Sequence, residues 1–423
     1  MKDVKNSEVN PIKWVPSTWF AMGLPFVALS AASSIMYKNM GVSDAKIAFW
    51  TSLIMLPWTL KPLWGPFLEL YRTKKFFVYT TQVFIGVLFG FLGLTLQLDS
   101  FFSVSIAVFT IIAIAGATHD TAADGVYLNE LDDTKQAKFV GWQGAFYNIA
   151  KVFSGGVLVY AAGELEKVIS IPNAWMIVMF GYGVVMLLLG FYNYRAIPSS
   201  QQISSTTSLK EGFATLKDVI ITFFQKKHIW FSLCFIVFYR FAEGQAIKII
   251  PLFFKASRED GGLALSTSEI GLLYGVFGAI AFVLGSILAG NFVAKKGLNR
   301  QTLIILCAFF NIPFAAYTFL AVFVPTDLYL IGAAVVIEYF GYGFGFVGLI
   351  LFMMQNIAPG KYKMAHYAFG SGLMNLGFMI PSMISGLLSD YLGYKEFFIW
   401  VLLATIPAFI VSWIVPLRKS SSD

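Results

Sequence analysis

The stretch LYLIGAAVVIEYFGYGFGFVGLILFMM, residues 328–354, decides the class of fold, because a single charged residue, Glu338, interrupts its apolar run. A helix needs about 20 predominantly apolar residues to cross the hydrocarbon core of a bilayer, and this stretch is longer. Inside lipid, only helices and closed barrels satisfy all of their backbone hydrogen-bonding groups. The stretch therefore predicts a membrane-spanning helix.

The remainder of the chain repeats this pattern of long apolar stretches separated by short polar breaks. Of 423 residues, 57% are hydrophobic and 13% are charged, whereas about a quarter of the residues in soluble domains are charged. The sequence therefore predicts an all-α membrane protein with twelve transmembrane helices. The predicted spans lie near residues 17–37, 47–67, 76–98, 101–124, 139–162, 172–194, 229–254, 269–294, 301–324, 327–357, 365–389 and 397–416.

Lysine and arginine are distributed unequally between the two sides of this predicted topology. With the N-terminus inside, the inner segments hold 20 of the 30 basic residues and the outer loops hold 6, and basic residues favour the cytoplasmic side. We therefore expect a multi-pass protein of the cell inner membrane, monomeric in the lipid bilayer, with both termini cytoplasmic. The net charge of +7 follows from this topology, so it does not indicate a nucleic-acid partner.

Three pairs of markers recur at a nearly constant offset, which indicates an internal repeat. The pairs are GVSDAKIAF (41–49) with ALSTSEIGL (264–272), GPFLELYRTKK (65–75) with GNFVAKKGLNR (290–300), and Asn148 with Asn375. Their offsets are 223, 225 and 227 residues. In the second copy, Ser266 and Glu269 have the spacing of a capping box at a helix start. A duplication explains the shared register, so we expect two pseudo-symmetric halves of six helices each.

The longest polar break separates the two predicted halves. Its segment SSQQISSTTS (199–208) has the composition of a flexible linker. Apolar residues at helical spacing follow it up to Phe223, which predicts an amphipathic helix on the inner membrane surface. The chain therefore divides into an N-terminal half (1–194), a cytoplasmic linker (195–228) and a C-terminal half (229–423).

The predicted spans hold a compact set of charged side chains, counting histidine, in an environment where charge is costly and marks function or pairing. The set consists of His119, Asp120, Asp124, Lys151, Arg240, Glu243, Lys248 and Glu338. Arg240 and Glu243 share a helix face, and with Glu338 they lie near the bilayer midplane. Glu338 has no basic neighbour in sequence, and desolvation favours its protonated form, which suits a proton carrier. Alternatively, the three residues form a fixed ion-pair lattice that positions helices.

The other charged residues leave alternatives open. Asp120 and Asp124 lie one turn apart near the cytoplasmic end of the fourth span, where they either brace an inner gate or relay protons. Lys151 either binds an anionic group of a substrate or neutralises Asp120. A lone histidine such as His119 is more often a hydrogen-bonded structural residue than a relay member. Lys248 fits a side chain that reaches outward to the membrane interface.

Two motifs that are typical of enzymes occur in the wrong context. Gly343, Gly345 and Gly348 spell G-x-G-x-x-G, but the dinucleotide-binding fingerprint needs a preceding strand. Ser43 and Lys46 fit S-x-x-K, but they lie at the predicted outer start of a helix. The sequence has no H-E-x-x-H motif, P-loop or cysteine cluster. These observations weigh against an intramembrane enzyme, the alternative class, and we expect no catalytic residue, metal or cofactor.

Six strings resemble the major facilitator superfamily, and within it the muropeptide permease (AmpG-type) branch, which includes acetyl-CoA and siderophore permeases. They are FAMGLPFVAL (20–29), LKPLWGPFLELY (60–71), ATHDTAADGVYLNEL (117–131), FSGGV (153–157), FYRFAEG (238–244) and IEYFGYGFG (337–345). The resemblance covers nearly the whole chain and implies the major facilitator fold. It also implies that Gly65, Glu69, Arg72 and Lys74 form a cytoplasmic gate. Ala294 replaces the acid in the second copy of this motif.

The chain departs from this branch in the fifth helix. Where the branch often has an arginine, this chain has Asn148, and Lys151 follows one turn later on nearly the same face. We expect Asn148, Lys151 and Arg240 to bind the substrate, and the rings of Tyr342 and Phe20 to stack on sugars.

The resemblance implies a proton-coupled importer of a peptidoglycan-derived amino sugar or muropeptide that works by alternating access. We expect Glu338, Glu243, Asp120 and Asp124 to handle the protons. The alternatives are a related permease for a siderophore, an acyl-CoA or another sugar, and a facilitator without ion coupling. The sequence does not choose among these small-molecule substrates, because selectivity depends on the shape of the binding cavity.

Overall fold

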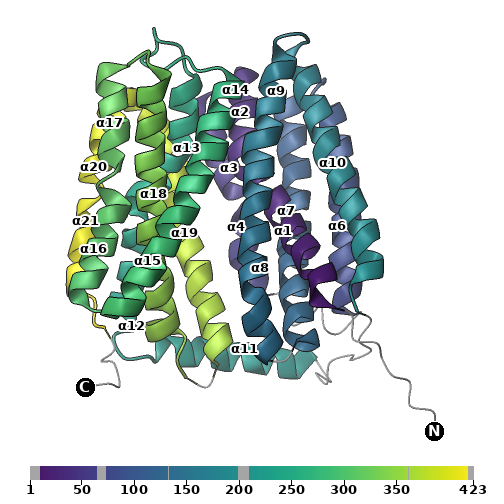
Figure 1. Ribbon diagram of the computed structural model, residues 1–423, viewed down its shortest axis with the longest axis vertical. Coiled ribbons are helices and arrows are strands. Elements are labelled where there is room, and N and C mark those ends of the chain that lie inside the picture. Colours follow the sequence, from purple (N-terminus) through teal and green to yellow (C-terminus); the bar gives the residue numbers. More distant parts are fainter. Residues whose placement is uncertain (1–9, 64–72, 132, 199–208, 361, 418–423) are drawn as a thin grey trace.

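The computed structural model describes residues 10–63, 73–131, 133–198, 209–360 and 362–417. These residues form helices, and no strand occurs among them, which confirms the predicted all-α fold. Within this part of the chain, ten helical stretches are long and apolar enough to cross a membrane. The helices run nearly parallel in one bundle (Figure 1).

The first group of helices fills one side of the bundle, and α1 packs against α7, α8 and α10 at its centre (Figure 1). Its helices are α1 (Val15–Val27), α2 (Ser33–Asn39), α3 (Asp44–Leu53), α4 (Leu56–Leu60), α6 (Lys74–Thr95), α7 (Phe101–Glu130), α8 (Asp133–Lys151), α9 (Leu158–Glu166) and α10 (Ile171–Ala196). The π-helical turn η2 (Ala28–Ala32) joins α1 to α2, and η4 (Val152–Val157) joins α8 to α9. Two of the long crossings are therefore wider at mid-height than a regular α-helix.

The second group of helices fills the other side of the bundle (Figure 1). Its helices are α12 (Ile229–Tyr239), α13 (Phe241–Lys255), α14 (Thr267–Ile270), α15 (Gly278–Lys296), α16 (Arg300–Asn311), α17 (Phe314–Phe323), α18 (Leu328–Phe352), α19 (Lys363–Leu392), α20 (Tyr394–Leu403) and α21 (Ile406–Ile414). The predicted capping box is present at α14, where Ser266 and Glu269 bond to each other's backbone N–H groups. The π-helical turn η5 (Gly271–Phe277) joins α14 to α15, and η6 (Met353–Ile357) follows α18.

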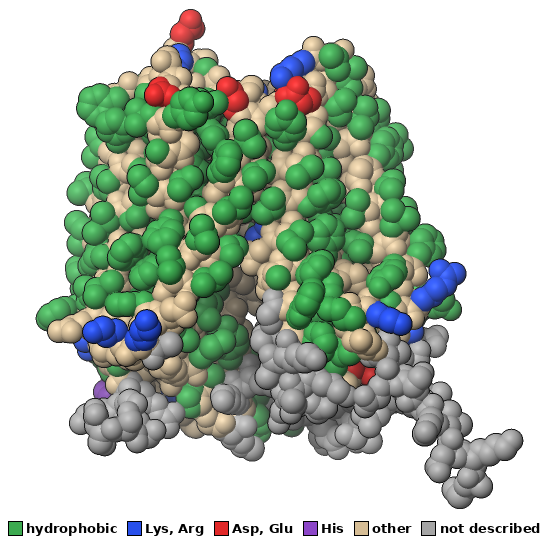
Figure 2. All heavy atoms as spheres, in the orientation of Figure 1, with side chains coloured by type: hydrophobic (Ala, Val, Ile, Leu, Met, Phe, Trp, Pro, Cys, Tyr) green, Lys and Arg blue, Asp and Glu red, His purple; other side chains and the backbone are tan. Residues whose placement is uncertain are grey.

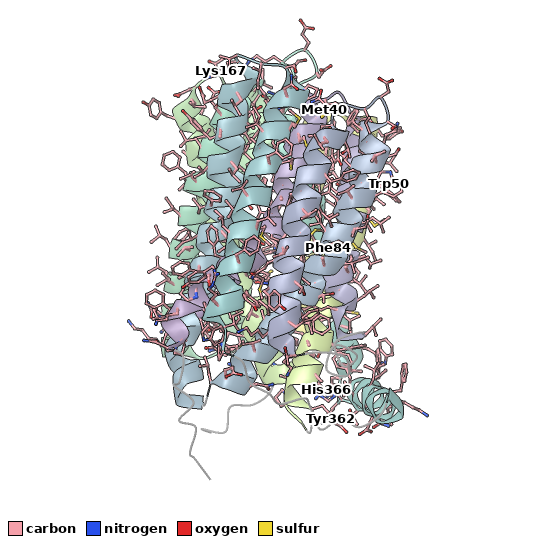
Figure 3. The ribbon with its side chains drawn as sticks, turned by 90° about the vertical axis from the view of Figure 1, so that its right-hand side faces the viewer. Met40, Trp50, Phe84, Lys167, Tyr362 and His366 are labelled. Carbon is pink, nitrogen blue, oxygen red and sulfur yellow. The ribbon has the colours of Figure 1, made fainter. Side chains whose placement is uncertain are left out.

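Helix α11 (Leu209–Phe224) lies across one end of the bundle, roughly perpendicular to the other helices (Figure 1). We call this the α11 end and the opposite one the far end. Figure 3 shows Tyr362 and His366 beside α11, and Lys167 and Met40 near the far end. Phe223 of α11 is fully buried, and its ring centroid lies 4.7 Å from that of Phe369 in α19. Helix α11 therefore anchors an apolar face on the second group of helices.

Two of the predicted spans are interrupted in the structure. The span 47–67 contains a turn between α3 and α4, and the span 229–254 is broken at Arg240, between α12 and α13. Arg240 has φ −103° and ψ 9°, which is the bridge region of backbone conformations. Neither span is therefore a single continuous helix.

Large apolar side chains cover the outer surface of the bundle at mid-height. Figure 3 shows Phe84 and Trp50 there, pointing away from the helices. Along α6 the exposed fractions are 48% for Phe84, 57% for Val87 and 53% for Phe91. Such a belt would be unfavourable in water and is stable against lipid chains. The protein is therefore a multi-pass membrane protein.

The two groups of helices contact each other between α3 and α19 and again where their π-helical turns η4 and η5 cross. An added Cβ atom on Gly275 would lie 2.2 Å from the carbonyl oxygen of Gly155. Any side chain at Gly275 would therefore push the two groups apart.

Polar contacts join the two groups at the far end. Asn39 donates to Thr267 Oγ1 at 2.8 Å, and Thr267 donates to Glu166 Oε2 at 2.6 Å. Tyr394 donates to Asp44 at 2.5 Å. On the side of the α11 end, by contrast, the face drawn in Figure 2 is hollowed between the two groups. The structure is thus closed at the far end.

Candidate functional site

A cavity of about 240 Å³ lies between the two groups of helices. Its polar and charged lining is formed by Ser30, Ser52, Thr59, Asn148, Lys151, Arg240, Lys248 and Asn375. Its aromatic lining is formed by Phe26, Trp58, Tyr274, Phe282, Tyr339, Tyr342 and Phe378. Asn148 and Asn375, the pair matched in the repeat, reach the cavity from opposite groups of helices. A polar solute in this cavity would face three basic groups, two amides and several rings.

Arg240 and Glu243 form a buried bidentate pair at the start of α13. Arg240 Nε donates to Glu243 Oε2 at 2.6 Å, and Arg240 Nη2 donates to Glu243 Oε1 at 2.7 Å. The exposed fractions are 6% for Arg240 and 2% for Glu243. The guanidinium carbon lies 4.5 Å from the ring centroid of Phe378 and 5.2 Å from that of Phe346. The break before α13 thus places the guanidinium group of Arg240 between two aromatic rings. Arg240 lines the cavity, whereas Glu243 does not.

Lys151, at the end of α8, holds its ammonium group against aromatic rings. Its Nζ atom lies 4.9 Å from the ring centroid of Tyr147 and 5.6 Å from that of Phe282. Among the described residues, no carboxylate lies within ion-pair distance of it. Lys151 therefore does not neutralise Asp120 by direct contact, and it faces the cavity with an uncompensated charge.

Lys248 does not reach outward to the membrane interface, so that prediction is wrong. Its side chain lines the cavity and is 4% exposed, and its Nζ atom donates to the carbonyl oxygens of Ser30 at 3.3 Å and Thr51 at 3.4 Å. Both acceptors belong to the first group of helices, whereas Lys248 belongs to the second. Within the described part of the chain, it too has no carboxylate partner. The cavity thus holds a third basic group.

Glu338 lies beside the cavity but does not line it. It is 5% exposed, and its Oε2 atom accepts a hydrogen bond from Tyr317 at 3.0 Å. Tyr339, the next residue in α18, does line the cavity, and its ring packs edge-on against that of Tyr274 at 5.0 Å. Tyrosine side chains therefore surround Glu338, and no basic group lies within ion-pair distance of it among the described residues.

Asp120 and Asp124 differ in environment although they lie one turn apart in α7. Asp120 is 7% exposed and accepts a hydrogen bond from Trp58 Nε1 at 2.8 Å. Its Oδ2 atom lies 3.9 Å from Lys61 Nζ. Asp124 is exposed. Lys74 of α6 is a predicted gate residue, and its side chain packs against Gly125 of α7, the helix that carries both aspartates.

The other predicted residues are placed as follows. Tyr342 lines the cavity, and its ring centroid lies 4.9 Å from that of Phe282. Phe20 does not line the cavity and packs against Phe153, with ring centroids 5.8 Å apart. The predicted gate residues Gly65, Glu69 and Arg72 lie outside the described residues.

Of the seven aromatic residues of the lining, the sequence-based prediction named only Tyr342 as a substrate-binding residue. In a chain with 17% aromatic residues, composition does not separate rings that face lipid from rings that face a cavity. The sequence offered one indication for Trp58, because this residue lies close to the string LKPLWGPFLELY (60–71) that resembles the permease branch.

Comparison with known proteins agrees with this architecture. The family model described as "Major Facilitator Superfamily" matches residues 16–385. An "Uncharacterized protein" of Haemophilus influenzae is 23% identical over 425 residues, covering 96% of this chain and 94% of the relative. The "Anhydromuropeptide permease" of Escherichia coli K12 is 22% identical over 401 residues, covering 93% and 77%. A solved D-xylose-proton symporter superposes with a TM-score of 0.71 at 14% identity, covering 97% and 98%; that likeness concerns the fold alone.

Proposed function

Because this chain belongs to the Major Facilitator Superfamily, it is a transporter and not an enzyme, and we propose that it imports an anionic cell-wall sugar together with protons. The substrate we propose is a peptidoglycan-derived amino sugar or muropeptide, entering across the cell inner membrane by alternating access. Relatives named as anhydromuropeptide permease and as AmpG transporters support this substrate class.

The charge of the cavity carries the proposal. Arg240, Lys151 and Lys248 all line it, and Glu243 neutralises only the first of them. A buried charge without a partner is costly, and the cost falls when an opposite charge arrives. An anionic solute would supply that charge. Muropeptides carry carboxylates beside their sugar rings, so they present the groups that basic and aromatic side chains recognise.

Proton coupling follows from the energetics of moving an anion into a cell. The membrane potential opposes entry of each negative charge by about 2.3 kcal/mol per 100 mV. One proton carried with each negative charge cancels this cost. Glu338 is our first candidate for the proton-binding group, because it is buried and has Tyr317 but no basic group beside it. Glu243, Asp120 and Asp124 are the further candidates.

The test is uptake by membrane vesicles that contain the overproduced protein. Radiolabelled 1,6-anhydro-N-acetylmuramyl tripeptide should accumulate when the lumen is more alkaline than the medium, and a protonophore should abolish the accumulation. Lys151→Met should lower the apparent affinity for the tripeptide, because the variant removes an uncompensated cavity charge while keeping the bulk of the side chain. Lys167→Met, at an exposed lysine outside the cavity, is the matched control.

Each other outcome assigns a different function. Uptake without dependence on the pH gradient would indicate an uncoupled facilitator and would overturn the coupling. Uptake of a ferric siderophore or an acyl-CoA, with none of the tripeptide, would overturn the substrate class.

A further inference from the structure

A chain of buried polar side chains runs through the first group of helices and ends at Asp120. It links Ser17 of α1, Asn193 of α10, Gln82 of α6 and His119 of α7. Asn193 and Gln82 are fully buried, and His119 is 1% exposed. His119 is hydrogen-bonded, as expected for a structural histidine, and its bond to Gln82 belongs to a chain that joins four helices.

The direction of each hydrogen bond in the chain sets the next one. Ser17 Oγ has two acceptors within reach, the Trp14 carbonyl oxygen at 3.1 Å and Asn193 Oδ1 at 2.7 Å; when the shorter bond is made, the amide nitrogen of Asn193 donates to Gln82 Oε1, which lies 3.1 Å away. The amide nitrogen of Gln82 then lies 2.9 Å from His119 Nε2. An amide nitrogen can only donate, so Nε2 of His119 must accept.

The consequence is a fixed tautomer of His119. If Nε2 accepts, a neutral imidazole carries its hydrogen on Nδ1. The Nδ1 atom lies 3.8 Å from Asp120 Oδ1. That oxygen is buried and accepts no hydrogen bond from any described residue, whereas Oδ2 of the same carboxylate accepts from Trp58. The polar chain therefore leaves the N–H group on the ring nitrogen of His119 that lies 3.8 Å from the unoccupied oxygen of Asp120, beyond hydrogen-bond distance.

Asp120 also lies next to the transport cavity. Trp58 lines the cavity and donates to Asp120. Its ring packs closely against α7, because a Cβ atom added to Gly116 would lie 2.8 Å from it. One aromatic side chain thus separates Asp120 from the cavity.

We propose that Asp120 binds a second transported proton on its Oδ1 atom, in addition to the one assigned to Glu338, and that His119, held in one tautomer by Gln82, Asn193 and Ser17, is its positioning residue. The inference rests on the proposed proton coupling and gives it a site in the first group of helices, separate from Glu338. Proton binding turns the carboxylate into a neutral carboxylic acid, and the imidazole stays neutral throughout.

The charged and titratable groups that face this site are few among the described residues. Lys61 lies 3.9 Å from Oδ2, and Asp124 lies one turn along the same helix. Lys74 of α6 and Tyr147 of α8 approach from the neighbouring helices. A polar chain that served only to brace helices would satisfy its buried atoms. Among the described residues nothing donates to Asp120 Oδ1, because His119 Nδ1 stays 3.8 Å away, so this oxygen keeps its lone pairs available for a proton.

Nitrogen NMR of histidine tests the positioning directly and needs no substrate. The chain has 3 histidines, so His228→Gln and His366→Gln identify the signal of His119 by elimination in protein labelled with [15N]histidine. We expect the neutral imidazole of His119 to carry its hydrogen on Nδ1. Gln82→Leu should release this tautomer, because nothing then donates to Nε2. A hydrogen on Nε2 in the unmodified protein would overturn the proposal.

Infrared difference spectra between alkaline and mildly acidic pH test the proton site itself. A band from a protonated carboxyl group should appear on acidification and should disappear in Asp120→Asn but persist in Asp327→Asn, whose carboxylate caps an exposed helix start. His119→Gln and Gln82→Leu should both move the pH at which the band appears, which residues that only brace helices would not do. A band that Asp120→Asn leaves unchanged refutes the assignment. If the vesicles fail to take up the tripeptide, the proposed function fails, whereas these two spectra still decide the proton site.

Discussion

The buried pair of Arg240 and Glu243 makes a quantitative prediction about stability. Both side chains are nearly inaccessible, and two hydrogen bonds of 2.6 and 2.7 Å join them. Replacing one partner leaves the other charge buried without compensation, which costs about 3–5 kcal/mol, whereas replacing both removes the charges together and costs less. Arg240→Met and Glu243→Gln should therefore each destabilise the protein more than the double variant does.

The assay is SDS titration of the purified protein, which gives the free energy of unfolding of each variant. The exposed pair of Lys167 and Glu164 has the same three-residue separation, so Lys167→Met and Glu164→Gln are matched controls and should have no measurable effect. If the cost of the double variant equals the sum of the two single costs, the two residues are independent and the reasoning fails. A double variant that folds but no longer binds the tripeptide would assign Arg240 to the substrate as well.

Three further predictions concern orientation, coupling and closure. In a background without native cysteines, a cysteine at Val168 should react with an impermeant reagent outside intact cells and one at Ser205 should not; labelling at Ser205 would reverse the orientation. Glu338→Gln should abolish uptake driven by a pH gradient while sparing counterflow, which moves no net proton. Normal uptake by this variant under a pH gradient would show that Glu338 does not carry the coupled proton. Gly275→Leu, where even a Cβ atom would lie 2.2 Å from an opposing carbonyl oxygen, should keep the far end open and raise labelling of a cavity cysteine from outside. Gly290→Leu, with nothing within 4 Å, should leave labelling unchanged, and equal labelling of both would contradict the role of the crossing.

The fold was predictable because the membrane imposes one simple condition on each crossing. A run such as 328–354 must be apolar along its length, and the structure has α18 there, from Leu328 to Phe352. The interruption at Arg240 could not be predicted, because neither glycine nor proline marks it. It depends on Glu243, Phe346 and Phe378, which hold the guanidinium group in place.

The candidate site was predictable in kind and not in detail. Costly intramembrane charges indicated Arg240 and Lys151, and both line the cavity. Phe20 was chosen because its ring lies in the string FAMGLPFVAL (20–29) and could stack on a sugar, and it packs instead against Phe153. Sequence spacing gives the face of a helix on which a residue lies, but not the rotation of that helix relative to its neighbours. Tertiary packing supplies this rotation.

His119 shows the same limit in a different form. Its partner Gln82 is 37 residues away in sequence, and Asn193 is 111 residues from Gln82. No local pattern connects these positions, and each residue alone fits a structural role. Only the packing of α6, α7 and α10 reveals that their side chains form one directed chain of hydrogen bonds.

Lys248 and Arg240 show that cavity charges of one sign need not behave alike during transport. Arg240 is bonded to Glu243 within the same segment, so a rigid motion of one group of helices against the other leaves this pair intact. The two acceptors of Lys248 are carbonyl oxygens of Ser30 and Thr51, which lie in the opposite group. Any motion that parts the groups at the far end removes both acceptors and leaves the ammonium group without a partner. An anionic solute that enters from that end, as we propose, would therefore meet Lys248 when the charge of the ammonium group is least compensated. Closure of the far end would then restore the carbonyl contacts of Lys248.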